Sequence, residues 1–213
     1  MKPLSQCRLY TFIDTACLRG RDPAQIARHL CQGGSDLVQI RAKNRPPGEI
    51  RRLAAAVAPI LRAAGVRLVI NDHYGLARET GADLCHMGQE DFFGAGLTRA
   101  AQLMTDPSAP PIGLSTHAPD EAMRALAASP AYVAIGPVFA TGTKPGAKPV
   151  TLDYVRWAAA SVTIPWFAIG GINLGNLDQV VAAGARAVCA LSAILDAPDI
   201  AEACREFKKR LPA

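Results

Sequence analysis

The feature that most constrains the fold is a regular alternation of short apolar runs with helix-like segments. Eight runs rich in Val, Ile, Leu and aromatic residues are typical of parallel strands that are buried on both faces. We expect these strands at residues 8–13, 37–41, 67–70, 84–87, 112–115, 132–135, 165–169 and 187–191. The first and last strands start seven repeats apart, at residues 8 and 187, which gives about 26 residues per repeat. This length is close to the shortest β–α unit.

The segments between these runs carry helical signals. Residues 50–61 place apolar side chains on one helix face, and Asp22 followed by Pro23 is a typical helix start. Further helices are expected near residues 23–32, 74–80, 97–104, 119–128, 152–160 and 200–211. Each predicted strand except the seventh is therefore followed by a predicted helix.

This alternation predicts an α/β protein with a single (β/α)8 TIM barrel. No linker or low-complexity segment interrupts the 213 residues, so we expect one domain over residues 1–213. The alternative is a doubly wound open sheet, because a sequence does not show whether the last strand closes onto the first.

The composition limits the classes of partner that we expect for this protein. The formal net charge is +5, but there is no basic block and no interleaving of basic and aromatic residues, so we expect no nucleic-acid partner. The charge suits small anionic substrates, and scattered surface Lys and Arg residues account for it equally well. No apolar run reaches the length of about 20 residues that spans a bilayer, and residues 1–8 lack the core of a signal peptide. Six cysteines without metal-ligand spacing indicate buried thiols in a reducing compartment, and we expect a cytoplasmic protein.

Polar residues follow nearly every predicted strand, at the end where barrels carry their active sites. Asp72 and Asp91 follow two neighbouring strands. A pair of carboxylates at one rim is suited to Mg²⁺, which combines one or two carboxylates with water and phosphate oxygens. The alternative is that each aspartate caps the helix that follows it.

Three cations are expected at the same rim. Arg41 and Lys43 follow the second strand, and Lys144 lies in the loop after the sixth. Together with a metal ion they would hold a diphosphate. The alternatives are that Arg41 is a structural ion-pair partner and that Lys144 is a solvated loop residue.

A second anion site is expected after the last two strands. Gly170, Gly171 and Ser192 occupy the loops where barrels often bind phosphate, although a glycine pair also serves a tight turn. Two anion sites imply two phosphorylated substrates, or one substrate with phosphate at both ends. His117, like the other histidines that follow strands, is expected to orient groups, and Ser115 with His117 forms no catalytic triad.

The ordered set of motifs resembles the thiamine-phosphate synthase family nearly from end to end. The most specific pieces are Gly-Gln-Glu-Asp at residues 88–91 and Thr-Gly-Thr-Lys at residues 141–144. The others are Gln-Ile-Arg-Ala-Lys at 39–43, Ile-Asn-Asp at 70–72, Gly-Ala-Asp at 81–83, Gly-Leu-Ser-Thr-His at 113–117, Gly-Pro-Val-Phe at 136–139, Ile-Gly-Gly-Ile at 169–172 and Leu-Ser-Ala-Ile at 191–194.

The resemblance implies a barrel enzyme that joins hydroxymethylpyrimidine diphosphate to a thiazole phosphate, forming thiamine phosphate and pyrophosphate. It implies that Mg²⁺ is bound by Asp72 and Asp91. The pyrimidine diphosphate would contact Gln39, Ile40, Arg41, Ala42, Lys43, Asn71, Ser115 and Lys144. The thiazole phosphate would contact Thr141, Gly142, Thr143, Gly171, Leu191 and Ser192. The catalytic residues would be Arg41, Lys43, Ser115 and Lys144.

Two departures from the family pattern stand in this sequence. Ala42 occupies a position where family members often have Glu, and His73 one where they often have a charged residue.

The alternatives to the synthase are an isomerase similar to the thiazole tautomerases and a barrel that only binds a thiamine precursor. The tautomerases tend to lack the two specific motifs. The sequence leaves the oligomeric state open, a homo-oligomer included.

Overall fold

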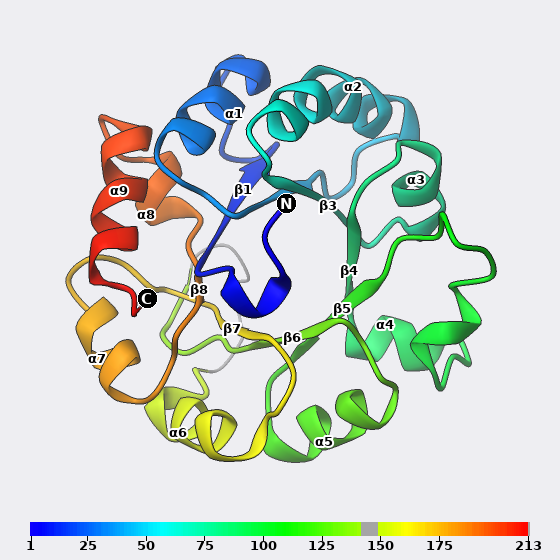
Figure 1. Cartoon of the computed structure of the whole chain (residues 1–213), viewed down its shortest axis with the longest axis vertical. Helices are drawn as coiled ribbons and strands as arrows, with labels where there is room; N and C mark the ends of the chain where they lie inside the picture. Colours follow the sequence, from blue (N-terminus) through cyan, green and yellow to red (C-terminus); the bar gives the residue numbers. More distant parts are fainter. Residues whose placement is uncertain (142–148, 213) are drawn as a thin grey trace.

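The eight predicted strands form a closed parallel barrel in chain order in the computed structural model, which describes residues 1–141 and 149–212 (Figure 1). β1 pairs with both β2 and β8, so the TIM barrel is confirmed and the open sheet is wrong. The strands are β1 (Leu9–Asp14), β2 (Leu37–Arg41), β3 (Arg67–Asn71), β4 (Leu84–Gly88), β5 (Ile112–Thr116), β6 (Tyr132–Ile135), β7 (Trp166–Ala168) and β8 (Val188–Cys189).

Helices surround this barrel on the outside (Figure 1). The α-helices are α1 (Pro23–Gln32), α2 (Pro47–Ala63), α3 (Tyr74–Glu79), α4 (Gln89–Gly94), α5 (Pro119–Ala127), α6 (Thr151–Ser161), α7 (Leu177–Ala182), α8 (Ser192–Leu195) and α9 (Ile200–Arg210). Two single turns, η1 (Leu4–Gln6) and η2 (Ala100–Gln102), are 3-10 helices. The predicted start of α1 is confirmed, since the Asp22 carboxylate accepts from the N–H of Ala24 and Pro23 begins the helix. No described helix is long and apolar enough to cross a membrane.

The helix predicted at residues 97–104 is wrong. That segment contains only η2, and the helix of this repeat is α4, directly after β4. The side-chain oxygen of Gln102 accepts from the N–H groups of Thr98 and Arg99, which holds the segment in a turn. Phe92 anchors α4 because its ring is fully buried, and Gly96, with φ of 78°, follows the end of that helix.

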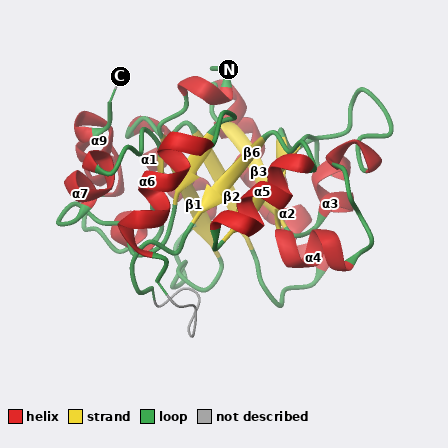
Figure 2. Ribbon diagram, turned by 90° about the horizontal axis from the view of Figure 1, so that it is seen from below, coloured by secondary structure: helices red, strands yellow, loops and turns green. Residues whose placement is uncertain are grey.

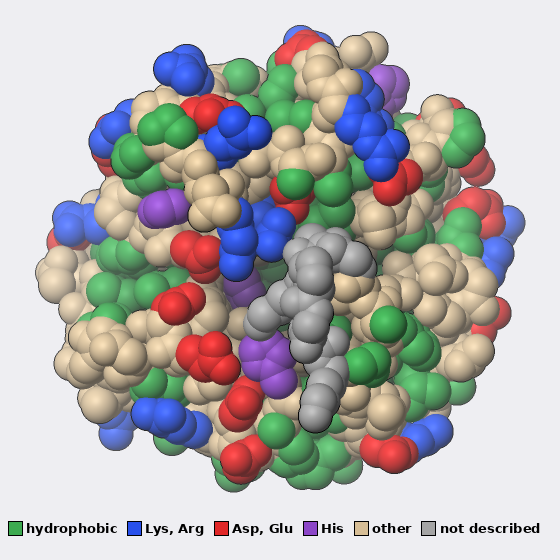
Figure 3. Space-filling view, turned by 180° about the vertical axis from the view of Figure 1, so that it is seen from behind, with side chains coloured by type: hydrophobic (Ala, Val, Ile, Leu, Met, Phe, Trp, Pro, Cys, Tyr) green, Lys and Arg blue, Asp and Glu red, His purple; other side chains and the backbone are tan. Residues whose placement is uncertain are grey.

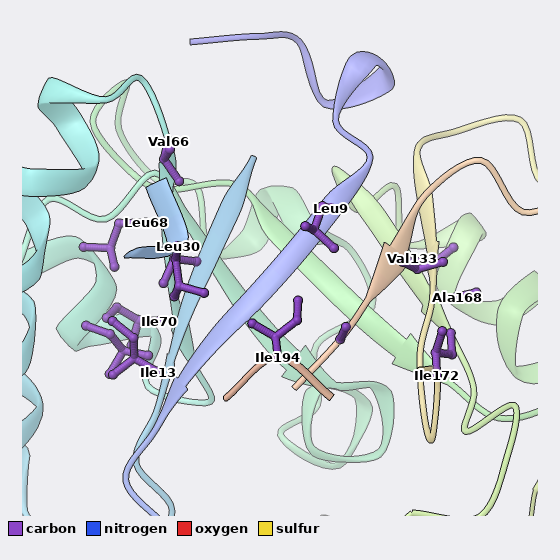
Figure 4. Packing of buried hydrophobic residues seen from close by; sticks show 14 of the residues in the cluster. Leu9, Ile13, Leu30, Val66, Leu68, Ile70, Val133, Ala168, Ile172 and Ile194 are labelled. Atoms are coloured by element: carbon purple, nitrogen blue, oxygen red, sulfur yellow. The ribbon is translucent and has the colours of Figure 1, made fainter. Parts of the chain in front are cut away.

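Alternation along the strands divides the apolar residues into two layers. The outer layer packs the strands against the helices and includes Leu9, Ile13 and Ile70 (Figure 4). Tyr10 belongs to the second layer, which fills the barrel interior together with residues from the other strands. Each fully buried Leu or Ile contributes about 1.5–3 kcal/mol relative to an exposed one. Gly113 is required in the interior, because a Cβ there would overlap the ring of Tyr132.

Both chain termini lie at one end of the barrel (Figure 2). Leu4 of η1 packs against the interior apolar cluster at this end. A buried carboxylate, Asp36, ties the same end together by accepting from the N–H groups of Arg8 and Leu9 and pairing with Lys2 and Lys208. The carboxyl ends of the strands therefore supply the open end of the barrel.

Candidate active site

A cavity of about 310 Å³ opens at the carboxyl ends of the strands. Figure 3, which views the molecule from behind relative to Figure 1, shows Lys and Arg, Asp and Glu, and His side chains close together near the middle of the face. The cavity brings together most of the side chains that the sequence predicted. These lining residues are Gln39, Arg41, Lys43, Asn71, Asp72, Asp91, Ser115, Thr141, Gly171, Leu191 and Ser192.

Two of the predicted residues that the structure describes do not line the cavity. Ile40 and Ala42 have their side chains in the outer layer between the strands and the helices, and both are buried there. The alternation along β2 turns Gln39 and Arg41 inward and therefore turns Ile40 outward. Their side chains therefore do not face the cavity. Gly142, Thr143 and Lys144 lie outside the described residues.

The carboxylates of Asp72 and Asp91 do not cap helices, so the capping alternative is wrong for both. The N-cap of α3 is His73, and the N-cap of α4 is Gly88 with Asp91 inside the first turn. Asp72 has a left-handed backbone, with φ of 63°, and its N–H donates to the carbonyl of His86 at 2.8 Å. This conformation is uncommon for a non-glycine residue and fixes the place from which the Asp72 side chain enters the cavity.

The two carboxylates repel each other across the cavity. Burial is the main cause that raises the pKa of Asp72; Lys43 counteracts it, and the negative charge of Asp91 raises the pKa further. The Asn71 side-chain NH₂ donates to Asp72 Oδ2 at 2.5 Å. Neither aspartate forms an ion pair within 4 Å with any described residue. A half-buried carboxylate, Asp72, and an exposed one, Asp91, repel each other and have no counter-ion within 4 Å among the described residues, which fits a hard divalent cation.

The donor set also limits what kind of metal site this is. In the described part of the chain, no three or more His, Cys, Asp or Glu residues are grouped so that they would hold a metal ion. Asp72 and Asp91 therefore suit a cation that takes its remaining ligands from water and substrate. Mg²⁺ bound through one or two carboxylates and phosphate oxygens has this requirement.

Arg41 is paired with a residue that the sequence analysis missed. Its Nη1 donates to Asp14 Oδ2 at 2.5 Å, and the Asp14 side chain is only 1% exposed. The alternative role of Arg41 as an ion-pair partner is thus confirmed, and Arg41 nevertheless lines the cavity. Asp14 ends β1 as the predicted polar residues end other strands, and this signal was available in the sequence.

The floor of the cavity is a buried chain of hydrogen bonds that the sequence analysis also missed. Gln39 Nε2 donates to the Tyr10 hydroxyl at 2.5 Å, the Tyr10 and Tyr132 hydroxyls are 3.0 Å apart, and Tyr132 Oη lies 3.0 Å from His86 Nδ1. With Gln39 as the donor, each hydroxyl accepts from one neighbour and donates to the next, so His86 Nδ1 accepts and Nε2 carries the proton. Burial lowers the pKa of His86 to about 4 and raises the pKa of both tyrosines. All four groups are neutral at pH 7.

The opposite side of the cavity presents backbone N–H groups. Gly170 and Gly171 have φ of 102° and 65°, and a Cβ on either would overlap the segment that follows β6. The Asn176 side chain donates to the carbonyl of Gly171 at 2.9 Å and holds the turn. Among the described residues, no acceptor pairs with the backbone N–H of Gly171 or Ser192. Uncommitted N–H groups of this kind suit a phosphate.

His117 is held at the rim by a glutamate. Glu121 Oε2 accepts from the backbone N–H of His117 at 2.7 Å and lies 3.1 Å from its Nδ1. Ser115 on β5 lines the cavity beside it. This arrangement fixes the imidazole from one side and provides no nucleophile elbow, as predicted.

A closed parallel barrel with a carboxylate pair, two cations and free N–H groups around one cavity defines a TIM-barrel enzyme for small phosphorylated substrates. Comparison with known proteins identifies the family. The model of the thiamine monophosphate synthase family matches residues 9–194, so the chain belongs to that family and the resemblance is confirmed.

The similar proteins agree with this assignment. A thiamine-phosphate synthase of Thermus thermophilus is 44% identical over 180 residues, which cover 84% of each chain. One of Acidothermus cellulolyticus is 42% identical over 99% of this chain and 97% of its own length. The solved structure of a thiamine phosphate pyrophosphorylase from Pyrococcus furiosus superposes with a TM-score of 0.85 at 25% identity, covering 98% of this chain and 97% of that one.

Proposed function

We propose that this protein is a Mg²⁺-dependent thiamine-phosphate synthase. It condenses 4-amino-5-hydroxymethyl-2-methylpyrimidine diphosphate with a hydroxyethylthiazole phosphate, carboxylated or not, and releases pyrophosphate. The observation that supports the proposal is one cavity lined by a carboxylate pair with two cations and by backbone N–H groups that suit a phosphate. The carboxylate pair after β3 and β4 faces the backbone N–H groups after β7 and β8, since these strands lie opposite each other in an eight-stranded ring.

The first site would hold the diphosphate. Asp72 and Asp91 would bind Mg²⁺, while Arg41 and Lys43 line the same rim as cations. When bound, the metal supplies Lewis-acid stabilisation of the charge that gathers on the departing pyrophosphate. Arg41 and Lys43 add electrostatic stabilisation to the same oxygens and hold them in place. Lys144 is proposed to act with them, and it lies outside the described residues.

The floor would hold the aminopyrimidine ring. His86 presents Nε2–H, and Gln39 and the tyrosine hydroxyls add further polar groups within a mostly apolar barrel interior. A ring with nitrogen acceptors and an exocyclic amino group matches such a surface. The electron-rich ring would stabilise the carbocation left by the departing pyrophosphate, so the protein needs no nucleophile and acts mainly by positioning.

The second site would hold the thiazole phosphate. Thr141, Gly171, Leu191 and Ser192 line that side of the cavity, and Gly142 and Thr143 are proposed to complete it from outside the described residues. The thiazole nitrogen would then attack the carbon from which pyrophosphate departs. We further propose a cytoplasmic enzyme, because all six cysteines are free thiols, as a reducing compartment maintains.

The test is pyrophosphate release, measured with both substrates and Mg²⁺. We expect release only when both substrates are present. A tautomerase-like isomerase would release none, and neither would a barrel that only binds a precursor, so an absence of pyrophosphate contradicts the proposal. Binding of the diphosphate should also require Mg²⁺ and should be lost when Asp72→Ala is combined with Asp91→Ala.

Lys144→Ala separates catalysis from binding. Removing one cation from the leaving-group site should lower kcat by about 10²-fold, as the loss of a single charge-stabilising donor does in other enzymes. The KM for the thiazole phosphate should change little, because that phosphate occupies the other site. An unchanged kcat would remove Lys144 from the mechanism.

A further inference from the structure

We propose that Asp14 is a positioning residue for the diphosphate site, acting through Arg41. The carboxylate of Asp14 sets the direction in which the Arg41 guanidinium enters the cavity, so that its remaining N–H groups meet the leaving pyrophosphate. This inference rests on the proposed function, and it gives a role to a buried charge that does not itself line the cavity.

The Asp14 carboxylate is fixed before it meets Arg41. Its Oδ1 accepts from the backbone N–H of Ala16 at 2.9 Å, in the turn after β1. The same turn is closed by the N–H of Cys17, which donates to the carbonyl of Asp14, and by the N–H of Thr15, which donates to the carbonyl of Arg41. Asp14 and Arg41 are also register partners at the ends of β1 and β2. The backbone and the side chains therefore hold this carboxylate in one orientation.

The pair leaves most of the guanidinium available. Asp14 engages Nη1 of Arg41, and no other described residue accepts from the Arg41 side chain. A guanidinium has five N–H donors in a rigid plane, so fixing one nitrogen orients the others. The Arg41 side chain is 16% exposed and reaches the cavity, whereas Asp14 is 1% exposed and does not. Asp14 thus meets the substrate only through Arg41.

A second buried aspartate serves as the matched control. Asp36 is also a nearly buried carboxylate, with a side chain 5% exposed, and it pairs with Lys2 and Lys208. It precedes β2 at the amino end of the barrel, away from the cavity. A purely structural role for buried ion pairs predicts that the two aspartates behave alike on substitution. The positioning role predicts that only Asp14 affects the diphosphate.

The experiment measures pyrophosphate binding by calorimetry in the presence of Mg²⁺, together with kcat and the two KM values. Asp14→Asn should weaken pyrophosphate binding by about 10- to 100-fold, the range seen when residues that orient metal ligands are removed. The KM for the thiazole phosphate should stay unchanged. In an Arg41→Ala background, Asp14→Asn should cause no further loss, because the group it positions is absent. Asp36→Asn should lower the Tm without changing pyrophosphate binding.

Asp14→Glu provides a second variant in case Asp14→Asn does not fold. It keeps the charge and the ion pair but moves the guanidinium, so it should weaken pyrophosphate binding while retaining most of the stability. Wild-type strength of pyrophosphate binding in both folded Asp14 variants would overturn the positioning role and leave the proposed function intact. A wild-type protein that binds no pyrophosphate with Mg²⁺ would overturn the proposed function, and the positioning role with it.

Discussion

Acidification should destabilise this protein through one buried imidazole, that of His86. The residue is 8% exposed, its ring stacks on Tyr132 with ring centroids 5.7 Å apart, and its Nδ1 lies 3.0 Å from the Tyr132 hydroxyl. Burial lowers its pKa to about 4. In the unfolded chain the pKa of a histidine returns to about 6.5. Between these two values the unfolded chain binds a proton that the folded protein does not.

The sign and the size of the effect follow from this difference. Stability rises with pH wherever the unfolded state binds more protons, so the contribution of His86 is fully present above about pH 6.5 and is lost as the pH falls toward 4. Each pH unit in that window is worth 1.36 kcal/mol, which gives a loss of about 3 kcal/mol over the whole window. For a domain of this size that loss corresponds to a Tm lower by about 6–12 °C.

The assay is urea unfolding at pH 7 and at pH 4.5, with wild type compared to His86→Gln. The variant starts less stable, because Tyr132 loses its partner, but its free energy of unfolding should fall less on acidification by about 2.5 kcal/mol. His29→Gln, a change on α1 outside the barrel interior, controls for the loss of a histidine elsewhere. Equal pH dependence in wild type and His86→Gln would refute the assignment of a neutral, buried His86.

Three further predictions concern packing and charge. Gly113→Ala should lower the free energy of unfolding by about 1–3 kcal/mol, because its methyl group would overlap a tyrosine ring, whereas Gly94→Ala, where a Cβ meets open space, should cost nothing in the same denaturation assay. Asp36→Asn should lower the free energy of unfolding by about 1.5–3 kcal/mol at pH 7. Burial acts to raise the pKa of Asp36, but its hydrogen bonds hold the pKa below the usual value. The difference in unfolding free energy from wild type should therefore shrink as the pH falls below 4. Asp91→Asn should lower the pKa of Asp72, since it removes a like charge, and a carboxyl NMR titration that finds this pKa unchanged would contradict the carboxylate pair.

The barrel and the residues at the mouth of its cavity were both predicted from one pattern, apolar runs that are followed by polar residues. Strands buried on both faces appear as bounded apolar runs, and polar residues after such runs must lie at the open end. This placed Asp72, Arg41 and Ser192 at one cavity correctly. The helices α7 and α8 were not predicted, because six and four residues are too few to show a helical period; α3, also six residues long, was predicted from the length of the connection between its two strands. The helix at residues 97–104 was predicted wrongly, since side-chain hydrogen bonds outweighed a helical pattern in a short segment.

Residues inside the strands were harder to assign than residues at their ends. Tyr10 and Tyr132 are 122 residues apart in the chain and meet only because the barrel closes. In a fully buried strand both faces are apolar, so the pattern does not show which residues point inward. A one-residue change in that assignment exchanges the two faces. The apolar pattern of the strands alone therefore did not connect the tyrosines with His86.

The residues at the strand ends indicate which face of each strand points into the barrel, because a residue that binds substrate must face the cavity. If Arg41 must reach a substrate at the mouth of the barrel, the period of two places Gln39 on the same inner face, one layer deeper. The same step from Gly88 arrives at His86, whose ring lies in that layer. A polar residue two positions before a residue that binds substrate at a strand end is therefore expected in the barrel interior. Its neighbours in the strand, such as Ile40 and Cys85, lie in the outer layer. The substrate-binding residue at the end of a strand thus determines which of its residues point inward, and those inward residues include the polar groups of the cavity floor.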